Sequence, residues 1–153
     1  MIGSAQSRSP RQAARALVSP VSLQARRLQR QFMRAGLRSE KVTLRTGTVS
    51  YWEGGSGPPL LLIAGFGGSA LWQWYPQVKA LRRHHRLIIP DLLFFGESHT
   101  GRADPSLRSQ ALAMVELLDH IGVSRTHILG LSYGGFVAYA VASEWPRRVR
   151  HLI

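Results

Sequence analysis

The sequence predicts an α/β protein built on a doubly wound, mostly parallel sheet. From residue 41 onward, short strand-like runs alternate with helical patterns, which is the order typical of a parallel sheet covered by helices. The run Leu60–Ile63 is apolar throughout, as expected of a strand buried on both faces. Glycine-rich loops follow two of the runs, at the edge where such sheets bind ligands.

The elements are expected in a regular order. Strands at 41–44 and 49–52 should form a hairpin around the turn Thr46-Gly47. The body then continues with a strand at 60–63, a helix at 70–82, a strand at 86–89, a helix at 109–121, a strand at 127–129, a helix at 133–143 and a strand from 149 to 153. In the helix at 70–82, we expect Leu71, Tyr75, Val78 and Leu81 to point inward.

Composition narrows the classes of function. The chain has 153 residues and 44% hydrophobic residues, enough for one domain with a packed core. It has no cysteine, which excludes a disulfide framework, a thiolate zinc site and a cysteine nucleophile. Because no two histidines have metal-binding spacing on a helix, and no phosphate-binding motif occurs, we expect neither a metal nor another cofactor.

The net charge of +12 is concentrated in a leader, residues 1–39, ahead of the body, residues 40–153. The leader has eight arginines and no acidic residue, whereas the body has 12 basic and 8 acidic side chains. The body carries no basic stripe interleaved with aromatic residues, so nucleic acid is not an expected partner.

Two helices are predicted in the leader, one capped by Ser9 and one running from Ser19-Pro20 to about Leu37, with Gly36 a candidate stop. The second has an apolar stripe of Val21, Ala25, Leu28, Phe32 and Ala35. Three interpretations stay open: an arm packed on its own domain, a peripheral contact with an anionic membrane through residues 9–38, or a cleaved organellar transit peptide. The expected location is cytoplasmic or peripheral to a membrane, with organellar targeting as the alternative.

Gly130–Gly134 has the pattern G-x-S-x-G between a predicted strand and a predicted helix. This is the context of a nucleophile elbow, which would lift the hydroxyl of Ser132 out of the sheet at the positive end of a helix. The two glycines would be needed because side chains there would collide with neighbouring backbone. A plain glycine-rich turn is the alternative.

The loop Ala64–Ser69 follows the strand at 60–63, where a serine hydrolase of this architecture takes its second oxyanion donor. We therefore expect the backbone N–H groups of Phe66 and Tyr133 to converge on the reacting carbonyl oxygen. A phosphate cradle is the rival interpretation, although neither G-K-[ST] nor G-x-G-x-x-G supports it.

Three segments together resemble the α/β-hydrolase superfamily, and more narrowly its esterase and lipase-like branch: Pro59–Ser69, Pro90–Ser98 and Gly130–Trp145. The resemblance spans about residues 41–153 and implies an α/β-hydrolase fold. It also implies hydrolysis of a small-molecule carboxylic ester through an acyl-enzyme on Ser132. One departure is Ala64, where the family usually has histidine before the first glycine of the loop.

The family's triad continues with an acid and a histidine, and this sequence offers neither in the expected place. Glu144 lies 12 residues along the helix from Ser132, which is about 18 Å. His151 and most other histidines fall at the amino edge of the sheet; only His99 is on the carboxyl side and could approach. We therefore expect an N-terminal part of an α/β hydrolase, incomplete at its C-terminus and inactive alone, or alternatively a non-catalytic remnant or binding module.

Overall fold

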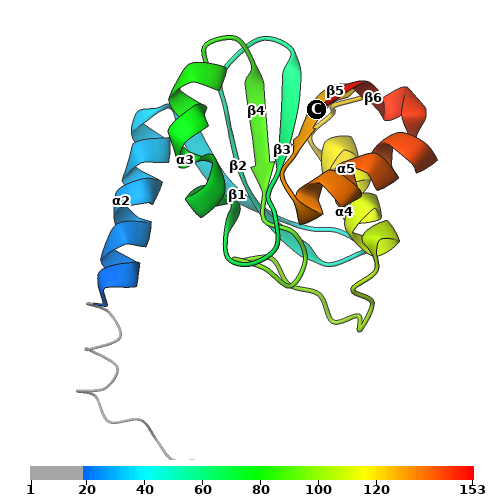
Figure 1. Cartoon of the computed structure of the whole chain (residues 1–153), viewed down its shortest axis with the longest axis horizontal. Helices are drawn as coiled ribbons and strands as arrows, with labels where there is room; N and C mark the ends of the chain where they lie inside the picture. The colour runs from blue at the N-terminus through cyan, green and yellow to red at the C-terminus, as the bar shows by residue number, and fades with distance from the viewer. Residues whose placement is uncertain (1–18) are drawn as a thin grey trace, which may run out of the picture.

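The computed structural model describes residues 19–153 and contains one six-stranded sheet with helices on both faces (Figure 1). The strands lie in the order β1-β2-β4-β3-β5-β6. Their bounds are β1 Leu37–Thr43, β2 Thr48–Gly54, β3 Pro59–Ile63, β4 Arg86–Pro90, β5 Thr126–Gly130 and β6 Val149–Leu152. β2 runs antiparallel to β1 and to β4, and the remaining pairs are parallel. The predicted fold class is confirmed.

One helix precedes the first described strand, and the others connect strands of the sheet. The helices are α2 Pro20–Arg34, α3 Ala70–Leu81, α4 Leu107–His120 and α5 Tyr133–Glu144, with the 3-10 turn η1 Pro146–Arg148 ahead of β6. α2 and α3 lie together on one side of the sheet, and α4 and α5 on the other (Figure 1). The predicted helix that starts at Ser9 lies outside the described residues.

Alternation along β3 divides the core into two clusters. Leu60 and Leu62 pack with α2 and α3, whereas Leu61 and Ile63 pack with α4 and α5. Because successive side chains of a strand point to opposite faces, an apolar strand of this kind needs a cover on both sides. This bears out the prediction that the strand at 60–63 is buried on both faces.

α2 begins as predicted and ends earlier than predicted. Ser19 caps it by accepting a hydrogen bond from the Ser22 N–H at 3.1 Å, and Pro20 occupies its first turn. The helix ends at Arg34 and not near Leu37, because Gly36 has a φ of +79° and turns the chain directly into β1. Strand β1 accordingly starts four residues before the predicted strand.

The C-terminal part of the apolar stripe of α2, Leu28, Phe32 and Ala35, faces the protein's own domain, whereas Val21 at its start is 68% exposed. Leu28 and Phe32 are 2% and 0% exposed, and the Phe32 ring packs edge-on against Trp52 with centroids 5.3 Å apart. The first interpretation of the leader, a helical arm packed on the domain, therefore describes α2. No helix in residues 19–153 is long and apolar enough to cross a membrane.

Two details of the helices differ from expectation. In α3, Trp74 is buried, whereas Tyr75, which we expected to point inward, is 38% exposed. Either residue has the helical spacing that would place it on the same face as Leu71 and Val78, and the packing of the helix against the sheet determines which one is buried. α4 starts at Leu107 and not at Ser109, because Ser106 caps it by accepting from the Ser109 N–H.

Candidate functional site

Ser132 occupies the turn between β5 and α5 in a conformation that few non-glycine residues adopt. Its φ is 53° and its ψ is −119°, and its side chain is exposed. Such strained backbone costs on the order of 1–3 kcal/mol and persists only where the surroundings hold it. The Gly134 N–H donates to Leu131 O and the Gly135 N–H donates to Ser132 O, so the first turn of α5 closes directly on the serine. Ser132 therefore projects from the carboxyl edge of the sheet at the start of a helix.

The glycines around Ser132 are required by close backbone contacts. A Cβ on Gly130 would lie 2.5 Å from the carbonyl oxygen of Gly134. A Cβ on Gly134 would lie 2.5 Å from the carbonyl oxygen of Ala64 and would also collide with that of Ile63. Separations below 3.0 Å force the backbone to move. The expected steric reason for G-x-S-x-G is confirmed at both ends of the motif.

Neighbouring parallel strands bring the loop after β3 against this turn. Ile63 pairs with Gly130 across β3 and β5, and the Leu131 N–H donates to Ile63 O at 3.0 Å. A Cβ on Gly65 would lie 3.2 Å from the Cβ of Ser132. The two segments that sequence reasoning singled out, 64–69 and 130–134, thus meet at one point of the sheet edge.

Gln73, which sequence reasoning missed, fixes the backbone of that loop. The Gly65 N–H donates to Gln73 Oε1 at 2.6 Å, and Gln73 Nε2 donates to Gly65 O at 3.4 Å. Gln73 is one turn into α3, whose first residue follows the loop directly. The only signal in the sequence was a polar residue close to the start of a helix after a glycine-rich loop.

The loop presents backbone donors and an aromatic wall. Within residues 19–153, neither the Phe66 N–H nor the Tyr133 N–H donates a hydrogen bond to another protein group. The Phe66 ring meets Tyr133 and Phe95 edge-on, with centroids 6.0 and 5.0 Å apart. The site therefore combines a serine hydroxyl, two unpaired N–H groups from adjacent loops and an apolar rim.

Asp91, at the end of β4, joins the neighbouring loops without contacting Ser132. Its Oδ1 accepts from the Ala70 N–H at 2.7 Å and its Oδ2 accepts from the Glu97 N–H at 3.1 Å. Burial raises the pKa of the Asp91 carboxyl, and these backbone hydrogen bonds work in the opposite direction. Asp91 thus anchors the start of α3 to the loop after β4.

With this geometry in view, comparison with known proteins decides the family. The sequence profile of the family described as "alpha/beta hydrolase fold" matches residues 58–153. The chain belongs to the α/β hydrolase family. The matched span contains β3, the loop that follows it and the whole Ser132 turn.

Relatives of this α/β hydrolase include lipases. Lipase 1 of Psychrobacter immobilis is 37% identical over 124 residues, covering 78% of this chain and 38% of that protein. A protein of Azorhizobium caulinodans, provisionally named carbamate hydrolase RutD, is 38% identical over 98 residues, covering 64% of this chain and 37% of that protein. This α/β hydrolase chain therefore spans less than half the length of these relatives.

Among solved structures, a membrane phospholipase A described as a bacterial virulence factor superposes with a TM-score of 0.80 and 31% identity. The match covers 92% of this chain and 47% of the phospholipase. A protein of Pseudomonas aeruginosa that is provisionally named an epoxide hydrolase superposes with a TM-score of 0.74 and 27% identity. The match covers 76% of this chain and 40% of that protein.

The structure places the carboxylates and histidines of this α/β hydrolase away from Ser132. His99 is held by paired backbone hydrogen bonds to Thr48 at the start of β2, and β2 is separated from β5 by two strands, about 14 Å. Glu144 pairs with Arg108 at the far end of α5. Within the described residues, no histidine or carboxylate contacts Ser132.

Two further histidines contact each other between the neighbouring strands β5 and β6. Nδ1 of His127 on β5 and Nδ1 of His151 on β6 are 3.0 Å apart, and the His85 ring lies 6.1 Å from that of His127. In residues 19–153, no group of three or more histidine and acidic side chains is arranged to hold a metal ion. This pair lies near the start of β5, away from the carboxyl edge that carries Ser132.

Proposed function

We propose that this chain carries the nucleophile and the oxyanion donors of a serine hydrolase that cleaves small-molecule carboxylic esters. The observation that carries the proposal is the Ser132 turn. A serine held at positive φ projects from the sheet edge between two sterically required glycines. The adjacent loop presents the Phe66 N–H, which has no hydrogen-bond acceptor among residues 19–153. The match to lipases supports an ester substrate.

The proposed reaction has two steps. Ser132 Oγ attacks the acyl carbon of the ester, and its proton passes through a base to the departing alcohol, leaving an acyl group on the serine. Water then attacks the acyl-enzyme, returning the proton to Ser132 and releasing the carboxylic acid. In both steps the carbonyl oxygen becomes an alkoxide, which the N–H groups of Phe66 and Tyr133 would stabilise.

We infer that the base and its acidic partner come from sequence beyond residue 153. No described histidine or carboxylate contacts Ser132, and the relatives are more than twice as long as the matched part. The exposed ring of Phe66 and the partly buried ring of Phe95 that it contacts give an apolar surface suited to an acyl chain. Acyl length and alcohol would depend on walls contributed by the added sequence.

The test uses a fluorophosphonate probe on a version of the protein that includes the sequence following residue 153. The probe should label this extended protein, and Ser132→Ala should abolish labelling while leaving the thermal unfolding midpoint unchanged. Ser143→Ala is the matched control, because Ser143 is a serine at the other end of α5. Labelling that persists in Ser132→Ala would place the nucleophile elsewhere.

The competing proposal is a non-catalytic protein that keeps the fold. Its supporting observation is that no histidine or carboxylate within residues 19–153 contacts Ser132. The two proposals differ in what the extended protein does. A catalytic lineage predicts that an acid and a histidine follow in frame and that the extended protein hydrolyses esters through Ser132. An extended protein that folds but neither labels nor turns over would favour the non-catalytic alternative.

A further inference from the structure

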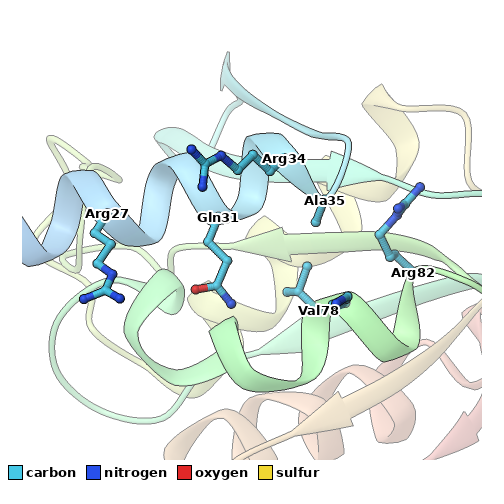
Figure 2. Close-up of a pocket in the computed structure, with 7 residues that line it drawn as sticks. Arg27, Gln31, Arg34, Ala35, Val78 and Arg82 are labelled. Carbon is cyan, nitrogen blue, oxygen red and sulfur yellow. The ribbon is translucent and has the colours of Figure 1, made fainter.

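A groove with a volume of about 410 Å³ runs between α2 and α3, on the opposite side of the sheet from α4 and α5 (Figure 2). Its walls are formed by Arg27, Gln31, Arg34, Ala35, Val78, Lys79 and Arg82. Four of these seven residues are cations. We call this feature the basic groove.

No acidic side chain balances the basic groove. All eight acidic residues of the chain lie in its described part, and none of them lines the groove. Five of them form ion pairs elsewhere, in the pairs Lys41–Glu97, Arg45–Glu116, Arg86–Glu53, Arg108–Glu144 and Arg148–Asp119. Of the other three, Asp91 is enclosed by the loop after β4, Glu40 lies on β1, and Asp104 lies in the segment before α4. The positive potential of the groove is therefore not neutralised from within the described part of the protein.

The groove is held in shape by the packing of the two helices. Gln31 Nε2 donates to Tyr75 O at 3.1 Å, which ties α2 to α3 across the groove. Val78 is 1% exposed at its base. Arg82 is half-buried, and its Nε is enclosed without a hydrogen-bond partner among the described residues. A partly desolvated guanidinium without a counter-ion is costly, and an anion in the groove would offset that cost.

The outer surface of α2 adds features that point to a lipid surface. Arg26 and Arg30 of α2 are exposed, and so are two apolar side chains of the same helix: Leu23 at 53% and Met33 at 55%. An interfacial helix combines cations for anionic headgroups with apolar side chains that enter the boundary region. A site for free phosphate or for nucleic acid has no use for exposed leucine and methionine.

We propose that the basic groove binds the phosphate of an anionic phospholipid headgroup and holds α2 along a membrane surface. Arg27 and Arg34 approach the headgroup from α2, and Lys79 and Arg82 from α3. The planar guanidinium groups donate paired hydrogen bonds to phosphate oxygens, while Lys79 acts as a point charge. Leu28 and Phe32, which face the domain, take no part in this contact.

The experiment measures flotation of the 153-residue chain with vesicles of phosphatidylcholine alone or with about 30% phosphatidylglycerol, an anionic lipid. Arg27→Gln/Arg34→Gln is the test variant, since both side chains are exposed and glutamine suits a helix. Arg102→Gln/Arg147→Gln is the matched control, because it removes the same charge from exposed arginines outside the groove. Equal thermal midpoints establish that both variants fold.

We expect binding only to the anionic vesicles. Each basic residue near such a surface contributes about 1 kcal/mol, so the test variant should partition about thirtyfold less. The control should stay within about threefold of the parent. Equal losses in the test variant and the control would overturn the proposal, because the attraction would then depend on net charge alone.

Two further titrations separate the lipid source from other phosphates. Inorganic phosphate that binds the parent and not the test variant, without any flotation, would assign the groove to a free phosphate and overturn the lipid source. Tight, steeply salt-dependent binding of duplex DNA that the test variant loses, again without flotation, would replace the membrane by a polyelectrolyte. Flotation with no response to either probe supports the headgroup.

Discussion

Gln73 holds Gly65 through both atoms of its side-chain amide, accepting from the Gly65 N–H at 2.6 Å and donating to Gly65 O at 3.4 Å. Gly65 in turn lies against Ser132, since a Cβ on Gly65 would come within 3.2 Å of the serine Cβ. A residue of α3 thereby sets the position of the loop whose Phe66 N–H we propose as an oxyanion donor. The position of α3 thus controls where the loop after β3 lies relative to Ser132.

Replacing Gln73 by Ala should loosen this loop. The Gly65 N–H would lose its acceptor, so we expect the free energy of unfolding to fall by about 1–3 kcal/mol in urea titrations of the 153-residue chain. In the extended protein, fluorophosphonate labelling should also slow. Gln77→Ala, an exposed change on the same helix, is the control. If Gln73→Ala and Gln77→Ala lower the free energy of unfolding and the labelling rate equally, the hydrogen bonds from Gln73 to Gly65 do not stabilise the loop.

Gly130→Ala should disturb the elbow far more than an alanine placed at an open glycine. The new Cβ would lie 2.5 Å from Gly134 O, so backbone has to move and a destabilisation of roughly 1–3 kcal/mol or more is expected. Gly101→Ala is the matched control, because a Cβ on Gly101 would have no neighbouring atom within 4 Å. Similar midpoints in thermal unfolding would contradict the steric account.

The elbow and the buried strand β3 were predictable because their signals are local. G-x-S-x-G and the run Leu60–Ile63 each specify backbone within a few residues. Other features depend on how distant segments pack: the inward position of Trp74, the hydrogen bonds from Gln73 to Gly65, and the contact between His127 and His151. The early start of β1 depends on a distant partner in the same way, since Leu37 pairs with Gly54 of β2. The end of α2 at Gly36, by contrast, had a local signal, because the glycine was a candidate stop in the sequence.

The 153-residue chain should show no appreciable esterase turnover. No described histidine or carboxylate contacts Ser132, and an unassisted serine hydroxyl is a poor nucleophile at neutral pH. Hydrolysis of p-nitrophenyl esters by the purified chain measures this directly, with Ser132→Ala as the reference. A turnover near about 10 s⁻¹, a typical enzyme value, that disappears in Ser132→Ala would show that a base within this chain had been overlooked.

Acidification should destabilise the protein through the histidine pair between β5 and β6. The Nδ1 atoms of His127 and His151 are 3.0 Å apart, so one ring must donate and the other accept. Burial lowers the pKa of His127, with further lowering from the positive charges of His151, His85 and Arg150. The folded state thus binds fewer protons than the unfolded chain, whose histidine titrates near about pH 6.5.

The sign of the pH effect follows from that difference. The contribution of His127 is fully present above about pH 6.5 and is lost as the pH falls through its lowered folded value. Between about pH 7.5 and 5.5, the thermal midpoint of the parent should therefore fall more than that of His127→Gln, in which position 127 no longer titrates. His120→Gln, an exposed change on α4, should keep the parent's slope. Parallel slopes in the parent and His127→Gln would mean that protonation of this pair does not oppose folding.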